Sequence, residues 1–343
     1  MPAGSAGIVV IGRNEGDRLM ACLASLQGTG RAAACVANVD NVAYVVYVDS
    51  GSRDGSAERA RPHCNVVVEL DPARPFSAAR ARNEGFAALL AAQPNLAFVQ
   101  FLDGDCTLLP GWLAASTLAM QADPQRAVVI GPLQERRPEA SVYNRLCALE
   151  WKSAPGDVTN FGALGGIMLV RTEVFARLGG FNEQVIAGED SEFGVRIGMA
   201  GLKITKIAEP MATHDADIHR FGQWWRRSVR AGHAIGQRFS LNGRGPLQDC
   251  ARERRSVLVW GVSLPLLIAA LAPFTGGLSL LLAGGYFVLG QRIARFRKGQ
   301  GDSAADAWLY ARFVVLGKFA EAVGLLKFQL NRIAGRYRII EYK

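Results

Sequence analysis

Residues 97–105 read AFVQFLDGD, an apolar run that ends in two aspartates separated by one glycine. Similar runs rich in valine and isoleucine lie at 7–11, 44–49 and 65–70. Helix-like segments separate these runs, at 17–27, from Ser56 onward and at 78–92. Runs with little polar alternation are typical of a parallel sheet that helices cover on both faces. The pattern predicts an α/β fold with a mostly parallel central sheet within residues 1–240.

Polar clusters follow three of these runs. RNE follows the first run, DSGSRDGS the second, and DGD the fourth. In open α/β sheets, ligands bind outside the carboxyl ends of the strands. We therefore expect the functional site at this edge of the sheet.

Asp103 and Asp105 are the strongest local signal for chemistry. Alternate residues of a strand face the same way, so both carboxylates point to one side. Oxygen ligands of this kind suit a hard divalent cation, Mg²⁺ or Mn²⁺, which would offset the charge of a departing nucleoside diphosphate. The alternative is an ordinary Asp-Gly turn.

Two further clusters are candidates for binding an anionic ligand. Asp49 ends the second run, where its carboxylate can accept hydrogen bonds from a base or a ribose. Helix capping explains Asp54 and Ser56, but no structural role accounts for Asp49. Arg80 and Arg82 begin the helix at 78–92, where a guanidinium can meet phosphate. Arginines on an exposed helix are the alternative.

Acidic residues and a histidine in the next part of the chain complete the candidate site. Glu189 and Asp190 stand at a helix start, and a carboxylate in a cleft can act as general base on a hydroxyl. Acidic residues also favour helix starts through the helix dipole. His214 is a candidate third metal ligand, or else a structural histidine.

The segment QWWRRSVRAG at 223–232 combines indoles with arginines. Arg226 or Arg227 is a candidate to grip diphosphate. The two tryptophans would stack on a sugar or lie at a lipid interface.

Between Arg255 and Arg292 the chain carries no charged residue. Each half of this block is shorter than the roughly 20 residues that cross a bilayer. We expect a hydrophobic helical hairpin at 256–291 that spans or dips into the membrane, followed by a basic amphipathic tail at 292–343. A buried hairpin in a soluble domain is the alternative.

Charge and chain ends indicate the cellular location. Arginines flank both ends of the hairpin, which fits two cytoplasmic ends. The start of the chain lacks a signal-peptide pattern, so we expect a membrane-anchored protein at the cytoplasmic face of the inner membrane. The net charge of +9 favours anionic membrane lipids over nucleic acid as partner. Six cysteines without CxxC spacing indicate reduced thiols.

Together and in this order, the motifs resemble those of the family 2 glycosyltransferases, which are inverting enzymes with the GT-A fold. The resemblance covers about residues 7–235. The matching motifs are IGRNEG, VDSGSRDGS, ARNEG, LDGDC and GGFNEQVIAGEDSEFGVRIGMAG.

The resemblance implies a role for each matching residue. Asn14, Glu15 and Asp49 would contact the nucleoside of a UDP-, GDP- or dTDP-linked sugar, and Arg82 would lie by the donor. Asp105 would be the principal metal ligand with Asp103 supporting it. Asp190 would be the general base, with Glu189 beside it.

One departure limits the resemblance. Processive members carry Gln-x-x-Arg-Trp, whereas Gln223 and Arg226 match here and Arg227 replaces the tryptophan. We therefore expect transfer of one sugar per encounter, onto a membrane-presented, lipid-linked glycan in envelope or exported polysaccharide synthesis. The alternatives are a nucleotidyltransferase that makes sugar nucleotides and an inactive membrane-associated scaffold.

Overall fold

The computed structural model describes residues 5–27, 44–161 and 164–335, in two compact units. The first unit comprises residues 1–137 and 151–216, and the second comprises 138–150 and 217–343. Of the residues predicted to form one domain, 1–240, those at 138–150 and 217–240 lie in the second unit. Cys35 lies outside the described residues, and the other five cysteines are free thiols.

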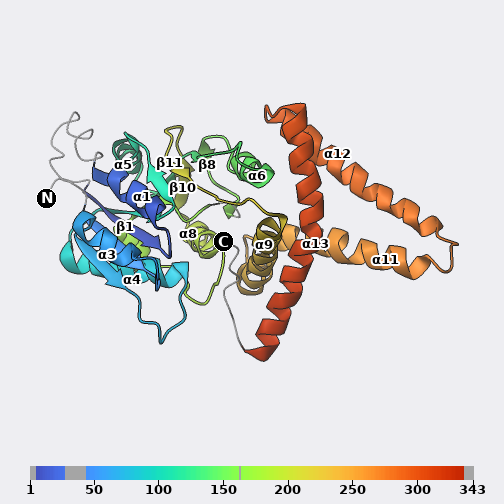
Figure 1. Cartoon of the computed structure of the whole chain (residues 1–343), viewed down its shortest axis with the longest axis horizontal. Coiled ribbons are helices and arrows are strands. Elements are labelled where there is room, and N and C mark those ends of the chain that lie inside the picture. Colours follow the sequence, from blue (N-terminus) through green and yellow to red (C-terminus); the bar gives the residue numbers. More distant parts are fainter. Residues whose placement is uncertain (1–4, 28–43, 162–163, 336–343) are drawn as a thin grey trace. The chain divides into compact units, whose positions relative to one another are not determined.

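An eight-stranded mixed sheet forms the centre of the first unit, in the order β3-β2-β1-β4-β9-β6-β10-β8. Figure 1 labels β1, β10 and β8 of this sheet. Its strands are β1 (Ala6–Gly12), β2 (Val45–Asp49), β3 (Val66–Glu69), β4 (Phe98–Asp103), β6 (Arg126–Ile130), β8 (Gly156–Asp157), β9 (Met168–Arg171) and β10 (Lys203–Lys206). The first four pair in parallel, as expected. β9, however, runs antiparallel to both β4 and β6.

Helices cover both faces of this sheet, because its strands bury side chains on both. On one face, valines such as Val9 and Val46 pack against α4 (Ala78–Ala92), α7 (Thr172–Arg177) and α8 (Glu189–Met199). On the other face, Ile8 and Tyr47 pack against α1 (Asp17–Gln27), α3 (Ser56–Ala60) and α5 (Trp112–Ala122). A short 3₁₀ turn, η1 (Arg61–His63), follows α3. The carboxyl ends of β1, β2 and β4 are thereby fixed side by side.

A separate three-stranded sheet lies beside the end of β4. Its order is β5 (Cys106–Leu108), β11 (Ala212–His214) and β7 (Leu133–Glu135). The register places His214 directly across from Cys106 on one side and from Glu135 on the other.

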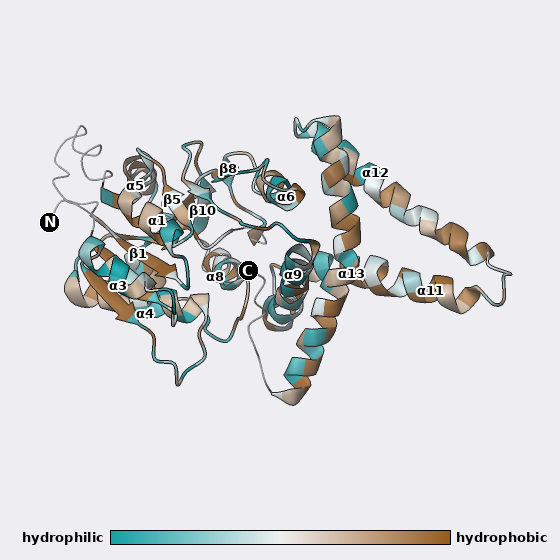
Figure 2. Cartoon of the chain, in the orientation of Figure 1, coloured by the Kyte–Doolittle hydropathy of each residue, from teal (hydrophilic) through white to brown (hydrophobic). Residues whose placement is uncertain are grey.

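The second unit is helical. It contains α6 (Val142–Glu150), α9 (Phe221–Asn242), α10 (Ala251–Leu258), a π-helical turn η3 (Val259–Ser263), α11 (Leu264–Leu271), a 3₁₀ segment η4 (Leu278–Ala283), α12 (Gly284–Gly299) and α13 (Ala304–Ala334). The expected helical hairpin is present, with α10, η3 and α11 as the outgoing arm and η4 and α12 as the return arm. Figure 2 shows apolar residues along both arms toward their tip.

The helices α9 and α13 cross at very short range. A side chain at Gly232 would collide with the carbonyl oxygen of Glu321, and one at Gly324 would collide with the carbonyl oxygen of Val229. Glycine at these two positions therefore lets the two backbones touch. His233 is fully buried in the same contact, beside Phe328.

Candidate active site

The loops after β1 and β2 are tied together by hydrogen bonds. Asn14 adopts a left-handed backbone conformation (φ 55°) and its amide donates to Ser52 Oγ at 2.9 Å. Its side-chain oxygen accepts from the Arg53 amide at 2.8 Å, and Ser56 Oγ accepts from the Gly16 amide at 3.2 Å. Asn14 and Glu15 thus lie on a braced loop at the expected edge of the sheet.

Asp49 has a structural role, although none was expected from the sequence. Its two carboxylate oxygens accept hydrogen bonds from the Tyr47 hydroxyl (3.0 Å) and from the amides of Gly51 (2.9 Å) and Ser52 (2.7 Å). Burial and the Asp49 charge raise the pKa of the Tyr47 hydroxyl, which therefore stays a proton donor. Asp49 is itself buried and shapes the loop that begins after β2.

Arg82 joins two of the sequence motifs. Its guanidinium donates to Asp103 Oδ1 and to Glu189 Oε1, each at 2.6 Å, although Glu189 is 107 positions away in the chain. Burial by itself would lower the pKa of Arg82, but the nearby carboxylates of Asp103, Glu189 and Asp190 raise it above the ordinary value. Arg82 is therefore a fixed positive charge in the site.

Gly166 makes this position of Arg82 possible. A Cβ at residue 166 would occupy the place of the Arg82 guanidinium. Arg80, by contrast, does not reach the site, because it bonds to Glu84 and to the carbonyls of Asp71 and Arg74. Arg80 therefore stabilises the loop before α4. In the sequence analysis it was considered as a residue that binds phosphate.

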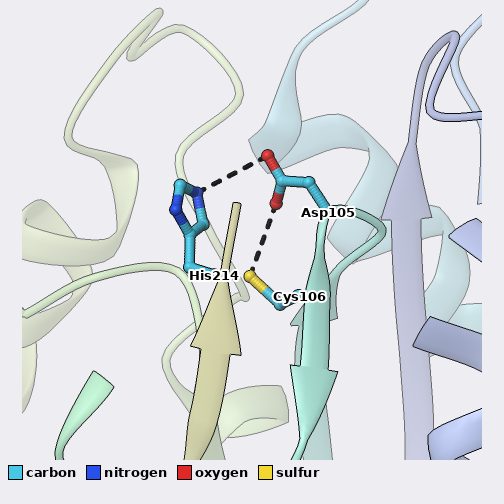
Figure 3. Close-up of side chains that lie close together, drawn as sticks. All are labelled: Asp105, Cys106 and His214. Carbon is cyan, nitrogen blue, oxygen red and sulfur yellow. Dashed lines mark hydrogen bonds and ion pairs between the residues drawn. The ribbon is translucent and has the colours of Figure 1, made fainter. Parts of the chain in front are cut away.

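A cluster of possible metal ligands begins two residues after Asp103, the partner of Arg82. Ligand atoms of Asp105, Cys106 and His214 all lie within 4.8 Å of one another. Figure 3 shows the Asp105 carboxylate between the imidazole of β11 and the thiol of β5. The amide of Gly104 donates to the Ile11 carbonyl at 2.8 Å, which anchors the Asp-Gly-Asp turn to the end of β1.

The geometry of the cluster fits a divalent cation. Asp105 Oδ2 and His214 Nε2 are 3.5 Å apart, too far for a good hydrogen bond. Two ligands that each lie about 2.1 Å from one cation have a separation of this order. His214 Nδ1 is buried without a hydrogen bond to any described residue, and it faces Glu135 Oε2 at 3.8 Å. Metal-ligating histidines commonly present their second nitrogen to such a carboxylate.

Asp103, which lies outside this cluster, and Cys106 have surroundings that differ from those of Asp105 and His214. Asp103 was predicted to support the metal, and one of its carboxylate oxygens, Oδ1, accepts a hydrogen bond from Arg82. Cys106 was not among the residues predicted from the sequence. It is fully buried, and burial, followed by the Asp105 charge, raises the pKa of its thiol. Cys106 therefore donates as a neutral thiol toward Asp105 Oδ1 at 3.4 Å.

Glu189 and Asp190 have different surroundings at the start of α8. Glu189 is buried and paired with Arg82. Asp190 is half-buried, and its charge acts on the same arginine. Of the two carboxylates, Asp190 is the more exposed.

Arg226 and Arg227 lie on α9 in the second unit. Arg227 pairs with Glu150 at 2.8 Å, and Arg226 is exposed. Trp224 was expected to stack on sugar or lipid, but it is buried edge-on against Phe313 of α13. Gln223 accepts from the amides of His219 and Arg220 and so caps the start of α9.

The first unit has the GT-A fold. The structure is similar to that of the mannosyltransferase PcManGT from Pyrobaculum calidifontis, solved with GDP-Man and Mn²⁺, with a TM-score of 0.63 and 21% identity over 95% of this chain and 87% of that one. It is also similar to residues 1–349 of S. aureus TarS, with a TM-score of 0.52 and 16% identity over 97% of this chain and 92% of that one. At these identities the likeness concerns the fold.

Sequence comparison identifies the family. Residues 7–176 match the family described as glycosyl transferase family 2, and residues 156–220 match the N-terminal domain of galactosyltransferase. Residues 7–176 therefore form a glycosyl transferase family 2 domain.

Curated relatives are similar over about half of the chain. The O-antigen chain rhamnosyltransferase WbaN of Salmonella anatum is 28% identical over 50% of this chain and 56% of its own length. The pre-mycofactocin glycosyltransferase of Mycobacterium tuberculosis is 30% identical over 50% and 37%, and glycosyltransferase AglE of Haloferax volcanii is 26% identical over 55% and 61%. The chain therefore spans less than two thirds of each relative.

Proposed function

We propose that this protein is a metal-dependent inverting glycosyltransferase that moves one sugar from a nucleotide-sugar donor to a hydroxyl of a lipid-linked glycan at the cytoplasmic face of a membrane. The observation that carries the proposal is the meeting of Asp105, His214, Arg82 and Asp190 at the carboxyl ends of the strands. The apolar hairpin supports the membrane location, and the O-antigen relative supports a glycan acceptor.

The residues divide the chemistry between leaving group and acceptor. Asp105 and His214 would hold Mn²⁺ or Mg²⁺, which offsets charge on the departing nucleoside diphosphate when bound. Arg82 adds a buried positive charge and holds Glu189 in place. Asp190 takes the proton of the acceptor hydroxyl as that oxygen attacks the anomeric carbon from the side opposite the diphosphate.

Nucleoside diphosphate release by detergent-purified protein tests this proposal. A panel of UDP-, GDP- and dTDP-sugars is offered with membrane lipid extract, and Mn²⁺ or Mg²⁺ is compared with chelator. We expect release from one donor, dependent on metal, and a product of inverted anomeric configuration by NMR. No release from any donor, together with no binding of metal or nucleotide, would refute the proposal.

Three variants separate the roles. Asp190→Asn should lower kcat by about 10²- to 10⁴-fold, as for loss of a general base, while Mn²⁺ binding stays intact. Asp105→Ala should abolish Mn²⁺ binding, measured by calorimetry. Glu173→Gln is the control, because Glu173 is an exposed carboxylate on α7 and should have no effect. Pyrophosphate release from a nucleoside triphosphate would instead identify a nucleotidyltransferase.

A further inference from the structure

The hairpin of the second unit has no charged residue from 256 to 291. Within the described residues, only the helical stretch Ala251–Leu271 is long and apolar enough to cross a membrane, with a mean hydropathy of 1.5. We propose that the hairpin is re-entrant: it enters the bilayer from one side, turns within the hydrocarbon layer and leaves by the same side. This inference rests on the membrane attachment proposed above.

The lengths of the two arms support a turn inside the bilayer. Arg252, Arg254 and Arg255 place the membrane surface near residue 255, so residues 256–271 reach a depth of about 24 Å at 1.5 Å per residue. On the return, the six residues of η4 rise about 12 Å at 2.0 Å each, and residues 284–291 rise about 12 Å more. Both arms are thus about 24 Å long, which is short of the roughly 30 Å hydrocarbon thickness.

The tip of the hairpin is apolar. Phe274 is 86% exposed, and Leu278 and Leu281 are 69% and 77% exposed. A tip that emerged on the far side would place these side chains in water or among polar headgroups. Large apolar side chains in such a continuous exposed patch indicate contact with lipid.

Several polar groups at the tip form hydrogen bonds within the hairpin itself. The Thr275 hydroxyl donates to the Leu271 carbonyl at 2.8 Å, and the Ser279 hydroxyl donates to the Ile268 carbonyl at 2.9 Å. The Gly277 amide, within the turn, donates to the Ala272 carbonyl at 3.0 Å. In hydrocarbon there is no water to bond such groups, so internal pairing is what a buried turn requires.

The middle of the hairpin shows the same internal pairing. In the π turn η3, the Leu264 amide bonds to the Val259 carbonyl. The next carbonyl, of Trp260, would then need the amide of residue 265, but Pro265 has no N–H. The hydroxyl of Tyr286 on the return arm donates to this carbonyl at 2.7 Å. This bond both satisfies the carbonyl and fastens the two arms.

Basic residues lie at the base of both arms. Arg252 and Arg255 are exposed on α10, and Arg292 and Arg295 are exposed on α12. Since the two arms are equally long, these arginines reach the same depth and face the same leaflet. Anionic headgroups of one membrane surface are the partner that this charge pattern fits.

Cysteine accessibility in sealed proteoliposomes tests the topology. Single cysteines replace Phe274 at the tip and Arg255 and Arg295 at the base, and the parent chain gives the background labelling. Phe274→Cys leaves the fold undisturbed because Phe274 contacts little of the protein. A membrane-impermeant maleimide is applied outside or is enclosed in the lumen.

We expect both base positions to label from the same face and residue 274 to label from neither until detergent is added. An environment-sensitive dye attached at 274 should be quenched most by lipids with a nitroxide deep in the acyl chain. Labelling of residue 274 from the face opposite to the base would overturn the re-entrant topology but leave membrane attachment standing. Labelling of 274 from the same face as the base would overturn both.

Discussion

Replacing Arg82 by methionine should destabilise the first unit strongly, because it removes the partner of a buried carboxylate. The Glu189 side chain is only 8% exposed and loses an ion pair of 2.6 Å, whereas Asp103 is one-third exposed and water can replace its partner. Breaking a buried pair costs about 3–5 kcal/mol. At about 2–4 °C per kcal/mol for a unit of this size, the melting temperature should fall by roughly 6 to 20 °C.

A second substitution distinguishes this cause from a general packing defect. Glu189→Gln removes the buried charge, so Arg82→Met combined with Glu189→Gln should recover about 2 kcal/mol relative to the sum of the single variants. Thermal unfolding is followed by circular dichroism in detergent without nucleotide. Arg59→Met is the control, since its pair with Asp17 is exposed and contributes under about 1 kcal/mol. Additive losses in the double variant would refute the reasoning.

Three further predictions concern stability and metal binding. Burial, followed by the Lys327 charge, lowers the pKa of His233 to about 4 in the folded protein. Because this histidine has an ordinary pKa of about 6.5 in the unfolded chain, the free energy of unfolding should decrease as the pH falls from about 6.5 to 4, by at most about 3 kcal/mol. The pH-dependent melting of His233→Gln should lack this decrease. Gly232→Ala should lower the free energy of unfolding by about 1–3 kcal/mol, because the new Cβ forces α9 and α13 apart. Gly222→Ala, whose Cβ would lie in open space on the same helix, should leave stability unchanged or raise it in the same thermal unfolding experiment. Glu135→Gln should weaken Mn²⁺ binding about 10- to 100-fold by calorimetry, and unchanged affinity would exclude a role for Glu135 in orienting His214.

Local sequence signals predicted much of the fold. The helices at 17–27 and 78–92 have the expected boundaries, because Ser77 caps the second and apolar residues recur at helical spacing in both. The strands at the start of the sheet were predicted from runs of valine and isoleucine. Asp105 and His214 were both candidate metal ligands, His214 from its chemistry alone, and the structure places Asp105 Oδ2 3.5 Å from His214 Nε2.

Features that depend on pairing between distant strands could not be predicted in the same way. The run that ends in Met168–Arg171 looks the same whether it pairs in parallel or antiparallel, because both of its faces are buried. Cys106 and Glu135 join His214 through the register of strands only three residues long, which carry no visible periodicity. Gly166 could not be singled out, since its importance depends on where Arg82 lies.

The hydrogen bonds that tie Asn14 to Ser52 and Arg53 have a consequence for engineering. These hydrogen bonds hold the two loops, at which we propose that the donor binds, in one fixed arrangement, although Asn14 and Ser52 are 38 positions apart in the chain. A transplant of residues 12–17 from a relative with a different donor would leave its amides facing the wrong partners. An exchange of donor preference should therefore move residues 12–17 and 50–56 together, as a matched cassette.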